Sequence, residues 1–340
     1  MINFASDNYA PTHPQVMQWL NRANNGPAQA YGNDTFTTQA QNEFKKQFGD
    51  ACDAFFVWNG TSANVLSLGS RLKSFQSVLC SDVAHITMDE CGAPERHLGS
   101  KLVLIPNHHG KIMPGQLEHY FHRLGDVHSV QPKILSLTQA TEYGTVYQLD
   151  ELKALVDLAH SHKMLIHLDG ARLANAAVTL KCSFKAMTTD LKIDLVSFGG
   201  TKNGLMGAEA VVFPQGEANQ EFAYIRKQGL HLASKMRYLS AQFLAYFEND
   251  LWKTNASHAN SMAQLLGNQL SEMGGEVSVT QPVQANGVFV SMPKSKITEL
   301  QKKFSFYTWN EQKNEVRLMC SFNTTAEEVN SFVNELRHLS

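Results

Sequence analysis

Short apolar segments typical of β-strands alternate with helix-like segments through the first two-thirds of this 340-residue chain. Two neighbouring parallel strands need a crossover between them, which is usually a helix. Such alternation is therefore typical of a mainly parallel sheet with helices on both faces. We predict an α/β fold of three layers, in which ligands bind beyond the carboxyl ends of the strands. The predicted strands lie at 54–58, 78–80, 101–105, 133–137 and 165–168, with helices at 37–48 and 149–161 and a further helix opened by 59–62.

The pattern changes after about residue 242. Two long helical stretches, 241–252 and 256–273, are followed by strand-like runs at 287–291, 304–308 and 315–321. A last helix begins at the capping box formed by Thr325 and Glu328. We predict a large domain over 1–242, with an irregular segment over 1–35, and a small C-terminal α+β domain over 243–340.

Composition restricts the class of protein. Hydrophobic residues make up 43% of the chain and charged residues 18%, which is typical of a globular protein. The net charge is −2 without a basic cluster, so we expect no nucleic-acid or membrane partner. The five cysteines are scattered, no signal peptide is visible, and we expect reduced thiols and a cytoplasmic location. The histidines lack metal-site spacing, so no metal is expected.

Two of the strand-like runs are followed by a charged residue with glycine nearby. Asp169 follows 165–168 and precedes Gly170, and Lys202 follows 194–200. Taken alone, Asp169 is a common turn former and Lys202 a common surface residue. Together they place an acid and an amine at one edge of the sheet. Pyridoxal 5′-phosphate needs this pair, because the amine forms a Schiff base and the carboxylate keeps the pyridine nitrogen protonated.

Further candidates surround this pair in the predicted loops. His167 shares a strand face with Asp169 and is a candidate donor to its carboxylate. His85 follows a predicted strand and could stack on the cofactor ring, its protonation set by Asp89, Glu90 or Glu95.

Cofactor phosphate and substrate carboxylate need hydrogen-bond donors and cations. Gly60 and Thr61 open a helix, where free N–H groups suit a phosphate. Lys227 and Arg237 are possible additional cations. A guanidinium binds a carboxylate through two parallel hydrogen bonds, which makes Arg172 and Arg317 candidate clamps; the alternative is that Arg317 is an exposed strand residue.

Several motifs occur in order and together carry a resemblance. The chain resembles the low-specificity L-threonine aldolases, which are fold-type I enzymes that use pyridoxal 5′-phosphate. It is most similar to a bacterial branch with the pattern His–x–x–x–Asp–Glu–Cys–Gly–Ala–Pro–Glu. The matching segments are 85–95 for this pattern and Ala5–Tyr9, Ala30–Asp34, Asn59–Asn64, Thr138–Tyr147, His167–Arg172, Phe198–Gly204 and Ala233–Arg237 elsewhere.

The resemblance implies roles for individual residues. Lys202 would be the Schiff-base lysine, Asp169 would pair with the pyridine nitrogen, and His85 would stack on the ring. Further residues implied to contact cofactor or substrate are Gly60 and Thr61 at the phosphate, Lys227 or Arg237 from a neighbouring subunit, Ser6, Arg172 and Arg317 at the substrate carboxylate, and Tyr31 from the other subunit. Arg172 would border the cofactor as well. The family forms tetramers built from active dimers.

Glu142 marks a departure from the family pattern. Many members have Thr–His–Asn–Gly where this chain has Thr141–Glu142–Tyr143–Gly144. Glu142 therefore takes the place of a histidine near the substrate hydroxyl and could accept its proton. The resemblance implies retro-aldol cleavage of L-threonine, L-allo-threonine or related β-hydroxy-α-amino acids to glycine and an aldehyde.

Alternatives to this activity are β-elimination or transamination on the same cofactor, a preference for phenylserine, and a binding module without catalysis. The joint presence of Lys202, Asp169 and Arg172 speaks against the binding module. A nicotinamide dehydrogenase is also α/β, but no G-x-G-x-x-G follows an early strand.

Overall fold

A seven-stranded sheet forms the centre of the molecule. The computed structural model describes residues 1–216 and 221–339. The strand order is β2-β8-β7-β6-β5-β3-β4; β8 runs antiparallel to both neighbours and the other pairs are parallel. The mainly parallel α/β fold is thus confirmed. The strands are β2 (Asp53–Val57), β3 (Gln76–Ser81), β4 (Lys101–Ile105), β5 (Gln131–Thr138), β6 (Leu165–Gly170), β7 (Leu195–Gly199) and β8 (Glu209–Phe213).

Helices cover both faces of this sheet. In β3, Val78 and Cys80 pack under α3, whereas Leu79 belongs to the core on the opposite face. This alternation follows from the two-residue period of a strand. The helices are α2 (Thr35–Phe48), α3 (Gly60–Gly69), α4 (His85–Met88), α5 (Ala93–Leu98), α6 (Pro114–Phe121), α7 (Leu149–Ser161), α8 (Leu173–Leu180), α9 (Phe184–Met187), α10 (Glu221–Gln228) and α11 (Arg237–Phe247). The helix predicted at 149–161 is therefore confirmed.

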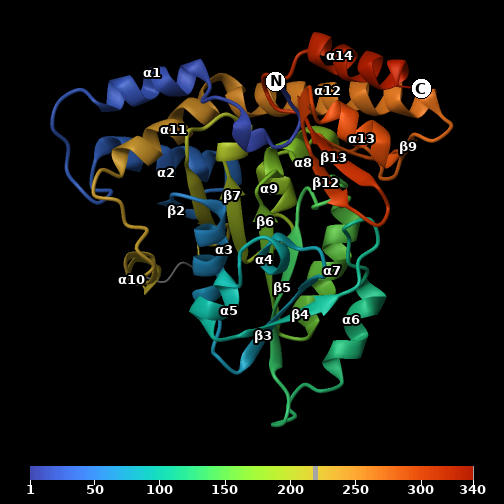
Figure 1. Cartoon of the computed structure of the whole chain (residues 1–340). Helices are drawn as coiled ribbons and strands as arrows, with labels where there is room; N and C mark the ends of the chain where they lie inside the picture. Colours follow the sequence, from blue (N-terminus) through green and yellow to red (C-terminus); the bar gives the residue numbers. More distant parts are fainter. Residues whose placement is uncertain (217–220, 340) are drawn as a thin grey trace.

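The C-terminal third builds a second hydrophobic core. Its antiparallel sheet has the order β12-β13-β10-β9, and Figure 1 shows α12 and α14 lying across the top of the molecule. Leu251 and Trp252 of α12 pack in the large core, while Leu266 and Leu270 pack in the second one. The elements are α12 (Leu251–Met273), β9 (Ser278–Val279), β10 (Gly287–Ser291), α13 (Lys294–Leu300), β11 (Phe304–Ser305), β12 (Tyr307–Asn310), β13 (Glu315–Met319) and α14 (Ala326–His338).

The N-terminal segment is more ordered than the sequence indicates. A strand, β1 (Ile2–Asn3), pairs in parallel with β11, and Phe4 is buried in the second core. A 3₁₀ turn, η1 (Asp7–Tyr9), and a helix, α1 (Pro14–Ala23), follow. The prediction that 1–35 is irregular is therefore wrong, because these short elements gain their stability from contacts with distant parts of the chain.

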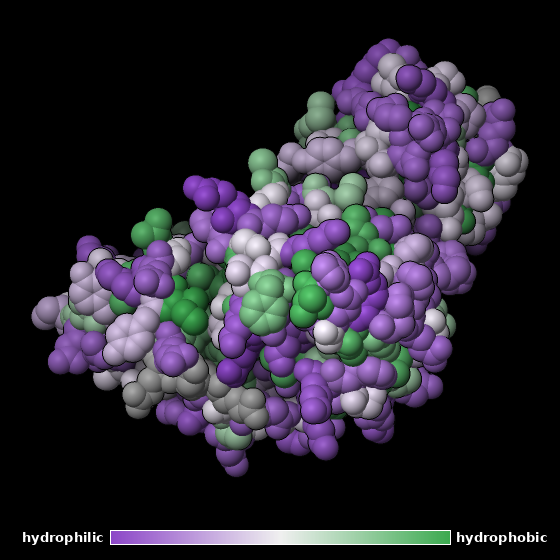
Figure 2. Space-filling view, turned by 90° about the horizontal axis from the view of Figure 1, so that it is seen from below, coloured by the Kyte–Doolittle hydropathy of each residue, from purple (hydrophilic) through white to green (hydrophobic). Residues whose placement is uncertain are grey.

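Two observations describe the outside of the molecule. Seen from below, hydrophilic side chains dominate and the hydrophobic ones form small groups among them (Figure 2). Among the described residues, no helix is both long and apolar enough to cross a membrane.

Candidate active site

A small cavity lies where several strands of the large sheet end. Its walls come from the loops after β2, β3, β5, β6 and β7. The cavity therefore occupies the place where parallel sheets bind ligands. The residues that line it are Gly60, Asn64, His85, Thr138, Ala140, Glu142, Asp169, Ala171, Arg172 and Lys202. Six of them are candidates from the sequence.

Lys202 stands on a short 3₁₀ turn, η2 (Thr201–Asn203), directly after β7. Burial lowers the pKa of its amine, and the positive charge of Arg172 lowers it further. The carboxylates of Asp7, Asp169 and Glu209 oppose this effect without cancelling it. An amine with a lowered pKa is more often uncharged and therefore a better nucleophile.

Asp169 is buried near the end of β6, where two N–H groups hold its carboxylate. The side-chain amide of Asn64 donates to Oδ2 at 3.0 Å, and the backbone N–H of Ala171 donates to Oδ1 at 3.0 Å. These two bonds fix the orientation of the carboxylate toward the cavity that it lines with Lys202.

His167 does not donate the hydrogen bond to Asp169 that the sequence analysis predicts. Its Nδ1 lies 2.8 Å from the hydroxyl of Ser136, and its Nε2 lies 2.9 Å from the hydroxyl of Ser197. These serines belong to the two neighbouring strands, so the side chain bonds sideways within the sheet and not along its own strand. Burial lowers the pKa of His167 to about 4, which makes it a neutral residue of the sheet interior.

Glu90 is the acid that accompanies His85. The imidazole Nδ1 lies 2.9 Å from Glu90 Oε1, which also accepts a bond of 2.8 Å from the amide of Asn64. The hydrogen bond to Glu90 raises the pKa of His85. Since Asn64 also donates to Asp169, one amide links the acid that accompanies the imidazole to the acid that lines the cavity.

Glu142 points a buried carboxyl into the cavity region. Its Oε1 accepts hydrogen bonds from the Thr138 hydroxyl at 2.8 Å and from the His85 backbone N–H at 3.0 Å. Its Oε2 is buried and has no hydrogen-bond partner among the described residues. Burial raises the pKa of this carboxyl to about 7. A carboxyl group that has an unoccupied acceptor oxygen and a pKa near neutrality is suited to take up and release a proton.

Arg172 is held by an acid that the sequence analysis did not select. Its Nε and Nη2 donate to Asp7 at 2.7 and 3.0 Å, in a bidentate pair. Asn286, directly before β10, also donates to Asp7, at 3.0 Å. Asp7 and Arg172 are 165 positions apart, so their pairing has no local sequence signal. Next to Asp7, Ser6 caps η1 by accepting the N–H of Asn8.

Arg317 on β13 brings a second guanidinium toward Arg172. Its Nη2 donates to the carbonyl of Ala5 at 3.5 Å, and its Nε is buried without a partner among the described residues. The guanidinium lies 4.9 Å from the ring centre of Trp309. Burial lowers the pKa of Arg317 to about 10, with a further contribution from Arg172. A buried guanidinium with an unpartnered N–H group is suited to bind an anion such as a carboxylate.

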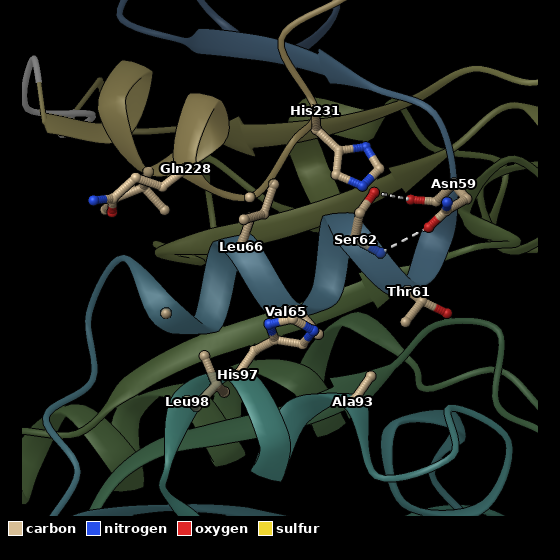
Figure 3. Close-up of a pocket in the computed structure, with 13 residues that line it drawn as sticks. Asn59, Thr61, Ser62, Val65, Leu66, Ala93, His97, Leu98, Gln228 and His231 are labelled. Atoms are coloured by element: carbon tan, nitrogen blue, oxygen red, sulfur yellow. Dashed lines mark hydrogen bonds between the residues drawn. The ribbon is translucent and has the colours of Figure 1, made fainter.

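The remaining predicted residues lie outside the residues that line this cavity. Thr61 lines a larger cavity of about 590 Å³, to which Ser62, Val65 and Leu66 of α3 also contribute (Figure 3). There Asn59 caps the helix by accepting the N–H of Ser62 at 2.9 Å. The Lys227 amine lies 5.4 Å from the ring centre of Tyr31, which is 49% exposed, and Arg237 donates to the carbonyl of Gly26.

The described residues fit pyridoxal 5′-phosphate by their chemistry. The cavity joins a buried amine of lowered pKa to a carboxylate fixed by two donors. Gly60 at the start of α3 leaves open space where a side chain would stand, next to the free N–H groups of the helix. Fold and site together are those of a fold-type I enzyme that uses this cofactor.

Comparisons with known proteins agree with this class. The sequence pattern of the beta-eliminating lyase family matches residues 3–294. Over 336 residues the chain is 40% identical to the low specificity L-threonine aldolases of Pseudomonas sp. (strain NCIMB 10558) and Pseudomonas aeruginosa, covering 98% of this chain and 96% of each relative. The chain therefore belongs to the beta-eliminating lyase family and, within it, to the low-specificity threonine aldolases, which makes it a carbon–carbon lyase.

Two solved structures are similar to this chain over nearly its whole length. The Leishmania major threonine aldolase superposes with a TM-score of 0.94 at 27% identity, covering 100% of this chain and 99% of that one. An aspartate aminotransferase from Thermus thermophilus has a TM-score of 0.74 at 14% identity and covers 100% and 96%. The latter likeness shows the fold alone.

Proposed function

We propose that this enzyme cleaves L-threonine, L-allo-threonine and related β-hydroxy-α-amino acids to glycine and an aldehyde. The observation that carries the proposal is the convergence of Lys202, Asp169, His85, Glu142 and Arg172 on one cavity. The relatives at 40% identity bear the name L-threonine aldolase. Bound through Lys202, pyridoxal 5′-phosphate supplies an electron sink for the bond that breaks at the substrate Cα.

The proposal gives Asp169, His85, Gly60 and Thr61 parts in holding this cofactor, and the first three of them line the cavity. The Asp169 carboxylate would pair with the pyridine nitrogen, and the His85 imidazole would stack on the ring. Gly60 and Thr61, at the N-terminal end of α3, bind the phosphate through their N–H groups and hydroxyl. The bonds from Asn64 and Ala171 keep the Asp169 carboxylate in one orientation.

Arg172 and Arg317 hold the substrate carboxylate, assisted by Ser6. The unpartnered Nε of Arg317 supports this role, and the bond from Arg172 to Asp7 limits how the first guanidinium can turn. Fixing the carboxylate determines which bond at Cα lies in the reactive orientation. Orientation of this kind is a large part of enzymatic rate enhancement.

Glu142 accepts the proton of the substrate β-hydroxyl at Oε2. As the oxygen loses this proton, its electron pair forms the carbonyl of the aldehyde and the Cα–Cβ bond breaks. The unpartnered position of Oε2 and the raised pKa of this carboxyl support the role. The proton is then available for return to the glycine product.

The test is a product analysis of the purified enzyme with threonine, allo-threonine and phenylserine. The proposal predicts glycine and the matching aldehyde in equal amounts. Release of ammonia and a keto acid without glycine would show β-elimination, and formation of a keto acid with loss of the cofactor's absorbance would show transamination. The ratio of rates among the three substrates also tests the alternative preference for phenylserine.

We further propose a homotetramer of two active dimers in the cytoplasm, each subunit divided near residue 242 into a large and a small domain. The side chain of Tyr31 is 49% exposed and has the Lys227 amine 5.4 Å from its ring centre, which leaves both groups accessible to the site of a neighbouring subunit. The five cysteines are free, as expected in a reducing compartment. Sedimentation measurements test the tetramer: a fully active monomer would contradict it.

A further inference from the structure

A buried acid on β8, Glu209, contacts the turn that carries Lys202 and has no part in the mechanism above. Its strand, β8, lies between β2 and β7, and the residue is 6% exposed. In the strand register it stands opposite Gly199, the last residue of β7. An acid in such a position is costly to bury unless it is hydrogen-bonded.

Both oxygens of Glu209 accept bonds from the backbone that leads to Lys202. Oε2 accepts the N–H of Gly200 at 3.2 Å, and Oε1 accepts the N–H of Thr201 at 3.3 Å. The hydroxyl of Thr201 in turn accepts the N–H of Ala208, directly before Glu209. The carboxyl thus ties β8 to the two residues immediately before Lys202.

Close packing also confines the backbone at the end of β7 and at the start of this turn. A Cβ added to Gly199 would lie 2.6 Å from the carbonyl oxygen of Ala171, and one added to Gly200 would lie 2.8 Å from the carbonyl oxygen of Ala208. Both approaches involve backbone atoms, so the turn has little freedom to shift. Glu209 adds hydrogen bonds to this close packing, because the buried N–H groups of the turn need acceptors.

We propose that Glu209 is a positioning residue for Lys202, which fixes the turn and adds a negative charge to the surroundings of the amine. The inference rests on the proposed role of Lys202 in holding the cofactor. Arg172, Asp7 and Asp169 also act on the Lys202 amine, the first lowering its pKa and the two acids raising it, as Glu209 does. Burial raises the pKa of Glu209 itself to about 7.

The test compares the cofactor-loaded wild type with Glu209→Gln and with a matched control, Glu315→Gln. Glu315 is likewise a buried strand carboxyl, but it belongs to the small sheet, and its Oε1 accepts a bond from the hydroxyl of Thr280 and not from the turn that carries Lys202. The cofactor's absorbance is titrated with pH, because its midpoint reports the proton held at the Lys202 nitrogen. In Glu209→Gln we expect this midpoint to fall by about 0.5 to 1 pH unit, since a negative charge is lost.

The side-chain amide introduced by Glu209→Gln would also replace one of the two acceptors by a donor. We therefore expect kcat to fall by about tenfold or more with little change in KM, because Lys202 is misplaced. Glu315→Gln should keep the wild-type midpoint and kcat. An unchanged midpoint and kcat in Glu209→Gln would overturn the inference.

The same experiment distinguishes failure of the proposed function from failure of the inference about Glu209, and a second variant covers the case in which Glu209→Gln does not fold. A wild type that shows no absorbance from cofactor bound at Lys202 would refute the proposed function and not only the role of Glu209. Should Glu209→Gln fail to fold, Glu209→Asp keeps the charge and shortens the reach. For this variant we expect a loss of kcat with a midpoint close to that of the wild type, and a wild-type kcat would overturn the inference.

Discussion

At the scale of single residues, the site depends on side chains whose charge is altered by burial. Lys202 and Glu142 have shifted pKa values for the same reason, since each is enclosed where water cannot stabilise its charge. The shifts have opposite directions because one group is a base and the other an acid. Both shifts favour the uncharged form, which is the nucleophilic form of the amine and the protonated form of the carboxyl.

The first prediction concerns Glu142. The pKa of about 7 means that the carboxylate form, which accepts a proton, is lost as the pH falls below neutrality. We expect kcat to rise with pH through about 7 in the wild type. Glu142→Gln should lower kcat by about 10²- to 10⁴-fold and abolish this acidic limb.

A second variant at this position serves as the control. Glu142→His introduces the residue type that the family resemblance implies at this position, and we expect it to retain more activity than Glu142→Gln with a changed ratio of threonine to allo-threonine cleavage. A Glu142→Gln enzyme with a wild-type pH profile would show that another group takes the proton.

The second prediction concerns Arg317. Arg317→Lys keeps a positive charge but loses the planar fork that binds a carboxylate. We expect KM for threonine to rise enough to lower kcat/KM by about 10- to 100-fold, with a smaller change in kcat. Arg337→Lys, on the exposed end of α14, is the matched control. Equal kinetics in the two variants would contradict the clamp.

The sequence predicted which residues line the site better than it predicted the hydrogen bonds that hold them. Lys202, Asp169, His85, Glu142, Gly60 and Arg172 all line one cavity, although their chemical roles stay predictions. The pairing of Arg172 with Asp7 and the bonds of Glu209 could not be predicted, because these partners come from separate strands and loops. The predicted bond from His167 to Asp169 is wrong, since adjacent strands offer closer partners than the same strand does.

At the scale of elements, the interior of the large sheet contains a neutral histidine. His167 has a folded pKa of about 4, below its ordinary value of 6.5, because burial disfavours the charged ring. As the pH falls below 6.5, the unfolded chain binds a proton that the folded chain does not take up. The folded state therefore loses stability between about pH 6.5 and 4, by roughly 3 kcal/mol in total.

The third prediction follows from this titration. We expect the free energy of unfolding of the wild type to fall between pH 7 and 5, as measured with urea. His167→Asn removes the titrating ring, and its stability should fall by about 2 kcal/mol less over the same interval. Parallel pH dependences in the two proteins would mean that His167 is charged or exposed in the folded state.

Element boundaries were predictable where local patterns decide them. The strand at 101–105 and the helix at 149–161 match β4 and α7, and both predicted bonds of the Thr325 and Glu328 capping box are present. Helix α1 was missed, because His13 and Pro14 start it within a stretch rich in turn formers. The run at 304–308 is divided into β11 and β12, which belong to different sheets.

At the scale of the whole molecule, the first residues connect the second core to the active site. Phe4 packs edge-on against Phe332 with ring centres 5.5 Å apart, and its backbone bonds to Ser305 and Met319. Three residues later, Asp7 holds Arg172. No local pattern predicts such a connection, because its partners lie far away in the sequence, as the 312 positions between Ala5 and Arg317 illustrate.

The fourth prediction tests this connection. Phe4→Ala leaves a cavity in the second core, and we expect it to lower the free energy of unfolding by about 3 to 5 kcal/mol. Displacement of Asp7 should raise KM for threonine as well. Phe75→Ala, at a 58% exposed position, is the control and should change stability by less than about 0.5 kcal/mol. Equal effects of both variants would contradict the account.

The fifth prediction concerns the covalent link on which every proposed role depends. Borohydride reduction of the cofactor-loaded enzyme, followed by proteolysis and mass spectrometry, locates the lysine that carries pyridoxal 5′-phosphate. We predict the added mass on the peptide containing Lys202, and its loss together with the visible absorbance and threonine cleavage in Lys202→Ala. Modification of a different lysine, or normal cleavage of threonine by Lys202→Ala, would contradict the account.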